Sequence, residues 1–236
     1  MNEDDSFIAA VREIFETKMG LGRIPLDQEL ERVEGQKGSV RLEVFRTGRI
    51  EKVVLSTITI ARTGVSETSA LVWPEDGHDL PVFWGNLTRI PGVMNVAILD
   101  FIPLVDVVLW PDYIERYMST LAEVRASALG LLAGCVLDGA VDLPSPVAFA
   151  LSPHRVVARI SEAGVERIPA VAEAYARAYV TLWDRTHPLP AGLKRELCLD
   201  RKAALRGLMR ANDPGHPHMV GAFGEQLTTR IFDAVF

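Results

Sequence analysis

The sequence has few of the features that mark an exported, membrane-bound or disulfide-stabilised protein. Its 236 residues include two cysteines, Cys135 and Cys198, which are far apart and are expected to be buried thiols rather than a disulfide or metal pair. The first residues, MNEDDSF, are acidic where a signal peptide would be basic. The longest apolar run, Leu121 to Leu137, contains two charged residues and is too short to span a bilayer. We therefore expect a cytoplasmic protein without a membrane segment.

Other absences narrow the function. The chain carries 25 basic and 31 acidic residues, for a net charge of −6, and no block of Lys and Arg that could follow a phosphate backbone, so nucleic acid is not an expected partner. It has no glycine-rich nucleotide loop, no HExxH and no nucleophile elbow. None of its five histidines is spaced with Cys or carboxylates as in a zinc site, so no metal is expected.

The residue pattern changes once along the chain, from strand-like to helix-like. After an amphipathic helix at Ser6 to Thr17, alternating or β-branched runs separated by Gly- or Pro-bearing turns predict consecutive short strands, which leave little room for crossover helices. They are Ser39 to Phe45, Ile50 to Ala61, Ser69 to Trp73, Pro81 to Leu87 and Val93 to Phe101. Helical spacing dominates from Pro111, at Asp112 to Leu137, Ile168 to Trp183, Leu199 to Arg210 and Val220 to Phe236, with one more strand candidate at Val147 to Ile160.

These elements predict an α+β fold. Alternating strands present an apolar face that must be covered, and the helices are numerous enough to cover both faces of the sheet. We therefore expect a three-layer α-β-α sandwich around a largely antiparallel sheet. No linker-like stretch divides the chain, so residues 1–236 are predicted to form one domain.

Two stretches carry a resemblance to a known family. The first runs from Asp79 to Asn86 (DLPVFWGN) and continues with Val96 to Leu104 (VAILDFIPL). The second combines Tyr175 and Tyr179 on a helix with Asn212-Asp213-Pro214, Phe223-Gly224 and the closing Ile231 to Phe236. Each piece is short, but they occur in order over roughly residues 50 to 236. In these motifs the chain resembles the ferredoxin-dependent bilin reductases.

The resemblance implies a cytosolic enzyme that reduces a linear tetrapyrrole such as biliverdin. The family implies that an antiparallel sheet and the C-terminal helices enclose the substrate. Electrons arrive singly from reduced ferredoxin, and no cofactor is bound. Because the tetrapyrrole itself holds the radical, the protein chiefly supplies protons and orientation.

The resemblance also points to individual residues. Asp213 matches the family's carboxylate that protonates the substrate from the helical side, although without the resemblance Asp213 would be interpreted as a cap beside Pro214. The family's carboxylate at the end of the "LP.FG.D" strand is replaced by Asn86, an amide that can hydrogen-bond a pyrrole or lactam but cannot give up a proton near neutral pH. The Glu and His that serve the vinyl-bearing ring in one branch fall at Thr59 (or Thr57) and Ser69, which are not acids. Reduction of that vinyl group is therefore not expected.

Further residues are candidates for contacts with the substrate. Arg159 resembles a family position that pairs with a propionate, and Arg210 is a second candidate, because Arg forms bidentate bonds with carboxylates. On sequence alone, both are more simply interpreted as solvated surface arginines. Alternation sends one of Phe83 and Trp84 into the pocket and the other to the outer helices, and the sequence does not say which.

Several hypotheses about function stay open at this point. Besides an active reductase acting on biliverdin or a close relative, the missing strand carboxylate favours a non-catalytic bilin-binding protein on the same fold. The motifs are also compatible with a reductase of chlorophyll-derived linear tetrapyrroles, related to the red chlorophyll catabolite reductases, and with an unrelated α+β protein. Transient docking of an acidic ferredoxin would need a local basic patch, for which the candidates are Lys194, Arg195, Arg201, Lys202 and Arg206.

Overall fold

A computed structural model of the chain describes residues 3–139 and 141–236. Within these residues an eight-stranded sheet runs in the order β1-β3-β4-β5-β6-β7-β8, and β2 pairs with part of β3. Every pairing is antiparallel, as expected for short strands joined by tight turns. The strands are β1 Gly22–Ile24, β2 Arg32–Gly35, β3 Gly38–Thr47, β4 Ile50–Ile60, β5 Val65–Pro74, β6 Val82–Ile90, β7 Met94–Ile102 and β8 Val156–Ile160.

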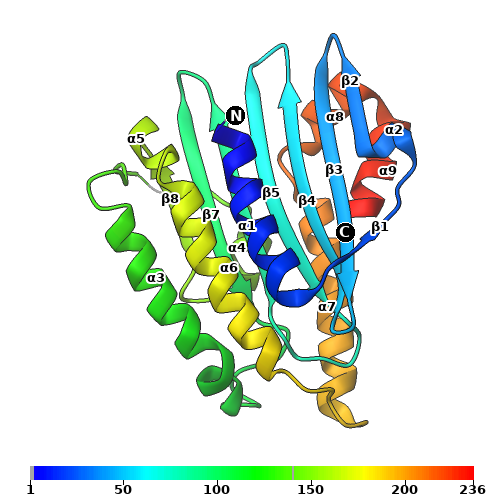
Figure 1. The fold of residues 1–236 in the computed structure, drawn as a ribbon, viewed down its shortest axis with the longest axis vertical. Coiled ribbons are helices and arrows are strands. Elements are labelled where there is room, and N and C mark those ends of the chain that lie inside the picture. Colours follow the sequence, from blue (N-terminus) through cyan, green and yellow to red (C-terminus); the bar gives the residue numbers. More distant parts are fainter. Residues whose placement is uncertain (1–2, 140) are drawn as a thin grey trace.

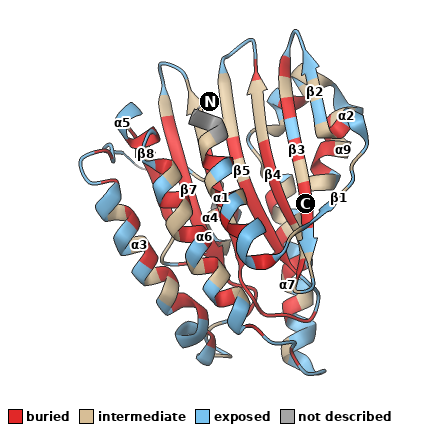
Figure 2. Ribbon diagram, in the orientation of Figure 1, coloured by how far each residue is buried: buried red, intermediate tan, exposed pale blue. Residues whose placement is uncertain are grey.

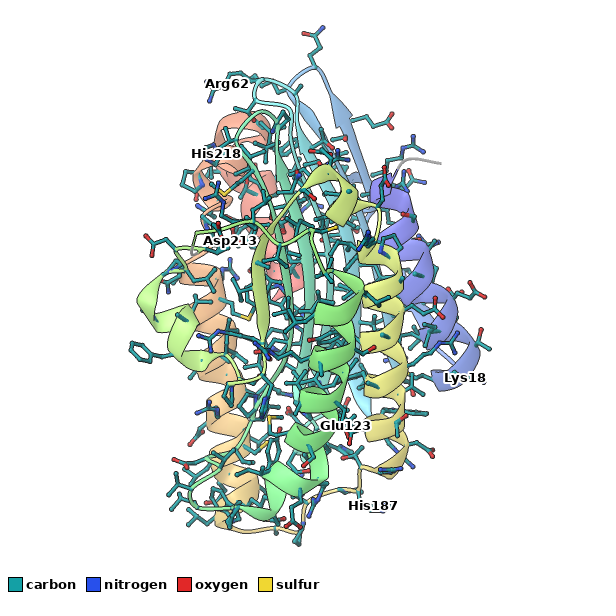
Figure 3. The ribbon with its side chains drawn as sticks, turned by 90° about the vertical axis from the view of Figure 1, so that its left-hand side faces the viewer. Lys18, Arg62, Glu123, His187, Asp213 and His218 are labelled. Carbon is teal, nitrogen blue, oxygen red and sulfur yellow. The ribbon has the colours of Figure 1, made fainter. Side chains whose placement is uncertain are left out.

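Helices cover both faces of the sheet, which confirms the α-β-α sandwich. Figure 1 shows α1, α3 and α6 in front of the strands, and the edge-on view in Figure 3 shows the C-terminal helices on the opposite side. The front layer contains α1 Glu3–Met19, α3 Ser119–Leu131, which continues a π-helical turn at Ile114–Met118, and α6 Ile168–Arg185. The back layer contains α4 Ser145–Ala150, α7 Leu193–Ala211, α8 His216–Phe223 and α9 Glu225–Val235, and the short helices α2 Gln28–Glu31 and α5 Glu162–Val165 lie at the periphery. The described helices are each too short or too polar to cross a lipid bilayer.

The core lies between the sheet and the front helices, where the central strands are buried (Figure 2). Phe83 of β6 makes an edge-to-face contact with Tyr179 of α6, with ring centroids 5.5 Å apart, and Phe101 of β7 does the same. Such rings bury large apolar areas in preferred geometries. Gly85, close to Phe83, leaves room for α1, because a Cβ there would lie 3.1 Å from the ring of Phe7. The glycine of the "FWGN" stretch is thus required for helix packing on this face.

Several element predictions need correction. The candidate strand at Val147 to Ile160 is helix α4 followed by β8, because the turn around Pro153 interrupts it. The helix expected at Val220 to Phe236 is two helices, α8 and α9, which Gly224 separates with a φ of 83° that other residues rarely adopt. The helix expected to reach Leu137 ends at Leu131, and β1, β2 and α2 were not predicted.

The back helices are tied to the sheet by polar contacts in addition to apolar packing, which joins Leu205 and Met209 of α7 to the main core and Phe232 of α9 to β3. Lys202 of α7 is buried and binds Glu51 Oε2 at 3.0 Å and the Pro74 carbonyl at 3.1 Å. Trp73 Nε1 donates to the Val235 carbonyl at 3.1 Å, and Lys52 Nζ donates to the Ala234 carbonyl at the same distance. A cation at the C-terminal end of a helix satisfies carbonyls that have no partner within the helix. These contacts hold α7 and α9 while leaving space farther along the sheet.

Asp79 and Asp100 are both fully buried and hold parts of the fold together. The carboxylate of Asp79 accepts from Tyr117 Oη at 2.8 Å and forms an ion pair with Lys194 Nζ at 2.9 Å, so it joins the 75–81 turn to the front helices and α7. Asp100 accepts from the Ser152 backbone N at 2.8 Å, and burial raises its pKa to about 6. This bond fixes the turn that leads into β8.

Removing the Asp79 carboxylate should destabilise the fold strongly. Asp79→Ala removes the buried carboxylate that Tyr117 and Lys194 contact and leaves Lys194 only its longer contact with Asp112 at 3.9 Å, so we expect the free energy of unfolding in urea to fall by about 3–5 kcal/mol. Glu173→Ala is the matched control, because Glu173 pairs with Arg177 at 2.7 Å in an exposed position outside this network and should cost less than about 1 kcal/mol. Equal losses in the two variants would contradict a structural role specific to Asp79.

Candidate functional site

A cavity of about 800 Å³ lies between the sheet and the back helices. This volume is within the range of about 300–1,000 Å³ typical of sites for organic ligands. Its walls are largely apolar, with residues from β4 to β8 on the sheet side and residues of α7, α8, α9 and the 141–144 segment opposite. The polar or titratable side chains that line it are Ser56, Glu67, Ser69, Asn86, Thr88, Asp142, Arg159, Asn212, Asp213 and His218.

Strand alternation decides which predicted residues reach this cavity. Trp84, Asn86 and Ser69 line it, and Ser69 lies directly opposite Asn86 in the β5–β6 pairing. Phe83 does not, because its ring packs in the front aromatic core, so of the two candidates Trp84 faces the cavity and Phe83 is excluded as a substrate contact. The prediction that Thr59 contacts the substrate is wrong for the same reason. Thr59 falls between Ile58 and Ile60, which line the cavity, and therefore projects from the opposite face.

Asn86 is held by its neighbours in one orientation. Thr88 Oγ1 donates to Asn86 Oδ1 at 2.9 Å, which leaves the Asn86 amide hydrogens for other partners. The Asn86 side chain also hydrogen-bonds Glu67, and because this contact lowers the pKa of Glu67, the amide is the donor. The position that resembles the family's strand carboxylate therefore presents an amide whose hydrogen bonds lead to a carboxyl group.

Glu67 is the functional candidate that the sequence analysis missed. It lies on β5 two residues before Ser69, on the same face of the strand, and opposite Thr88 of β6. The strand was predicted to begin at Ser69, whereas β5 begins at Val65, so Glu67 fell outside the predicted strand. Extending the alternation back from Ser69 would have placed a carboxylate on the cavity face, which is an unusual position for Glu.

Two carboxyl groups meet in this cavity, Glu67 from the sheet and Asp213 from the segment between α7 and α8. Burial and the nearby charge of Asp213 raise the pKa of Glu67 to about 7. Burial also raises the pKa of Asp213, although hydrogen bonds from Gly215 and the charge of His216 oppose this. Like charges close together cannot both ionise without cost, so the pair retains a proton toward neutral pH.

Asp213 performs the local role expected of an Asp before Pro and also faces the cavity. Its Oδ1 accepts from Gly215 N at 2.7 Å, closing a turn that leads into α8. Figure 3 places Asp213 and His218 on the same side of the sheet as the back helices. Asp213 also borders a smaller hollow outside the main cavity, lined by Gly207, Arg210, Ala211, His216 and Pro217. The carboxyl group thus lies between the cavity and the outer surface.

The two predicted arginines have different environments. Arg159 of β8 lines the cavity, and its guanidinium lies against Gly139, where a Cβ would be 2.8 Å from Nη1. Its Nε is buried and has no hydrogen-bond partner among residues 3–139 and 141–236. Arg210 lines only the smaller hollow and forms an ion pair with Asp233 of α9, so its expected contact with a substrate in the main cavity is corrected.

Most of the predicted basic patch is already engaged within the fold. Lys202 is buried in the contacts described above, Lys194 pairs with Asp79, and Arg206 pairs with Glu51 at 2.7 Å. Arg201 Nε donates to the Pro103 carbonyl at 2.8 Å. These groups hold α7 on the sheet, so they do not form the free patch that the sequence suggested. Among the residues described, no group of three or more His, Cys, Asp or Glu side chains is arranged to hold a metal ion.

Comparisons with known proteins agree with this geometry. A family model described as ferredoxin-dependent bilin reductase matches residues 8–236. A search of curated protein sequences gave no match. Among solved structures, the chain is similar to phytochromobilin synthase from tomato, solved in complex with biliverdin, with a TM-score of 0.79. The two are 21% identical, and the match covers 95% of this chain and 78% of the tomato chain.

The structural similarity confirms the fold, and the family match covers nearly the whole chain, including β4 to β8 and the back helices that form the cavity. A ferredoxin-dependent oxidoreductase acting on bilins is the class of protein that this match shows. The chain belongs to the family of ferredoxin-dependent bilin reductases.

Proposed function

We propose that this protein reduces biliverdin or a close linear tetrapyrrole by successive one-electron transfers from ferredoxin, each accompanied by a proton from the cavity. One observation carries the proposal: an apolar cavity of about 800 Å³ has carboxyl groups on its two opposing walls and, at β8, the Arg159 Nε donor, which has no hydrogen-bond partner within the described part of the chain. The tomato enzyme, which shares the fold, was solved with biliverdin. That ligand has both a conjugated apolar body and carboxylate groups.

The apolar walls give the substrate its position. Trp84 on β6 offers a flat ring to a conjugated ligand, while Ile58, Val96 and Ile98 on the sheet and Phe232 on α9 exclude water. Exclusion of water matters because protonation of a radical anion should come from positioned groups rather than from bulk solvent. The sheet wall and the back helices therefore confine the tetrapyrrole within reach of the carboxyl groups.

Proton delivery is the chemistry that the chain itself must supply. Electrons come from the iron–sulfur protein, and the tetrapyrrole holds them in its conjugated system. Asp213, whose pKa is raised by burial, keeps a proton closer to neutral pH than an exposed Asp would, and it faces the cavity from the helical side. Asn86 orients the substrate through hydrogen bonds to the central nitrogens but transfers no proton.

The same wall supports a proposal about the product. Ser69 lines the cavity where one branch of the family has a titratable side chain, and Thr59 projects away from it. Neither side chain acts as an acid near pH 7. We therefore place the reduction elsewhere than at the exocyclic vinyl group, at positions that Asp213 and its neighbours can reach.

Arg159 should recognise a propionate of the substrate. Its buried Nε has a hydrogen to donate, and a carboxylate would satisfy it. In Arg159→Gln we expect the Kd for biliverdin to rise about 10–100-fold, measured by absorbance titration, because one charge-assisted hydrogen bond is lost. Biliverdin dimethyl ester should bind the wild type and the variant equally, and Arg177→Gln, on the exposed side of α6, should bind biliverdin as the wild type does. An equal loss for the diester would mean that Arg159 only supports the fold.

The reductase assignment is tested by anaerobic turnover. Wild-type protein loaded with biliverdin should give a blue-shifted product when reduced ferredoxin is added, and Asp213→Asn should slow this conversion about 100-fold or more, because a general acid is lost. Asp233→Asn is the control, since Asp233 pairs with Arg210 on the outer surface. Binding without conversion in the wild type would identify a bilin carrier instead, and turnover of Asp213→Asn at the wild-type rate would remove Asp213 from the mechanism.

A further inference from the structure

The proposed function assigns proton transfer to Asp213 and leaves the part played by the Glu67 carboxyl group unassigned. Glu67 faces the cavity from the sheet, opposite Asp213, and receives a hydrogen bond from Asn86, which Thr88 orients. Among the described residues Glu67 forms no ion pair that would explain an acid on the cavity face of a central strand, and the groups that shift its pKa are Asp213 and Asn86. Stabilising a fold does not require an acid in such a position, since burying an ionisable group costs free energy.

We propose that Glu67 is a second proton donor of this site, delivering its proton from the sheet side of the cavity while Asp213 delivers one from the helical side. The inference rests on the proposed function. In this proposal Glu67 donates the proton that a carboxylate at position 86 would donate, because this chain has an amide at that position. Because Glu67 lies two residues along β5 from the partner of Asn86, its longer side chain reaches the neighbourhood of residue 86 through the Asn86 hydrogen bond.

The reaction balances with groups already named. One electron from the reduced iron–sulfur protein enters the conjugated system of the tetrapyrrole. The O–H bond of Glu67 breaks, an N–H or C–H bond forms on the substrate, and Glu67 is left as a carboxylate. A second electron and the proton of Asp213 complete a two-electron, two-proton reduction. Both carboxylates recover protons from water, and Asp213 borders the outer hollow where water has access.

The charges around Glu67 set the pH range of this donor. The cavity is also lined by the carboxylates of Asp213 and Asp142, the guanidinium of Arg159 and the imidazole of His218. His216, on the same helix as His218, lowers the pKa of Asp213 through its charge. Burial and the Asp213 charge raise the pKa of Glu67 to about 7, so the donor is protonated below that pH and lost above it. We therefore expect the rate of reduction to fall as the pH rises through about 7.

The decisive comparison uses Glu67→Gln, Glu67→Asp and wild type. Glu67→Gln keeps the hydrogen-bonding shape, so its Kd for biliverdin should stay within about threefold of wild type, whereas its rate of reduction by ferredoxin should fall about 100-fold and lose the decline above pH 7. Glu67→Asp should recover part of the rate. Glu173→Gln, an exposed glutamate on α6 that pairs with Arg177, should behave as wild type at every pH. A Glu67→Gln protein with the wild-type rate and pH profile would overturn the proposal.

A stability measurement tests the same carboxyl group without any substrate. The pKa of Glu67 is about 7 in the folded protein and near 4.5 in the unfolded chain. Folding therefore favours the protonated carboxyl, and the stability that Glu67 contributes below pH 4.5 is lost as the pH rises through about 7. Glu67→Gln should therefore melt about 3–8 °C higher than wild type at pH 8 and at the same temperature at pH 4.5. Equal melting temperatures at pH 8 would show that Glu67 is not held as an acid, which contradicts the proposal.

The two measurements separate the possible failures. If wild-type protein neither binds nor reduces biliverdin but Glu67→Gln shows the stability difference, the proposed function fails. Glu67 is then still an acid with a raised pKa, but its role as a donor falls with the function. If wild type reduces biliverdin and Glu67→Gln is unaffected in both measurements, the proposed function stands and only the role of Glu67 is lost.

Discussion

The alternation of side chains across one antiparallel sheet is the constraint on which the rest of this structure depends. Along β6, Phe83 and Gly85 face the front helices, while Trp84 and Asn86 face the cavity. A shift of one residue in the pairing would exchange these two sets and place the aromatic core in the cavity. The register is fixed by the front face, where rings from β6, β7 and α6 pack together, and the cavity-facing residues are thereby held in place.

The two faces are packed to different extents, which explains how an open cavity persists in a folded protein. The front face buries aromatic and aliphatic side chains continuously, and this burial supplies most of the stability. The back helices pack on the sheet through smaller apolar contacts, such as those of Met209 and Phe232. They are also held by Lys202 of α7, which binds groups of β4 and β5, and by the bonds that Trp73 and Lys52 donate to carbonyls at the end of α9. These attachments fix α7 and α9 without filling the space farther up the sheet, so the apolar walls there remain open to a ligand.

The layers of the fold could be predicted from the sequence, but the details of the site could not. Alternation and helical spacing identified β3 to β7 and the main helices, because these signals are repeated over many residues. The short strands β1 and β2 have too few residues to show a period, and α4 was interpreted as part of a strand because Val147 and Leu151 are apolar in either conformation. The cavity face of β6 was undecided between Phe83 and Trp84, since alternation gives two faces but does not tell which one is open.

Among the site residues, motif positions were located and the others were missed for an identifiable reason. Asn86 and Asp213 were found because they stand within short recognisable stretches, whereas Glu67 stands in none. Its importance depends on an interaction between β5 and the α7–α8 segment, which are far apart in the sequence. Arg210 was chosen for being one turn before Asp213, but helical geometry turns it toward Asp233 of α9. Only the folded chain shows which charges share a cavity.

The amide at position 86 agrees with a site in which the acid of the sheet wall is Glu67 rather than residue 86. A carboxylate there would stand beside Glu67 and opposite Asp213, and three acidic groups in one apolar cavity would repel one another and bind protons too tightly to release them in sequence. An amide instead donates to Glu67 and accepts from Thr88, so it orders the acid without adding charge. Two carboxyl groups on opposite walls, with a neutral bridge beside one of them, are sufficient to present two protons to a ligand lying between the walls.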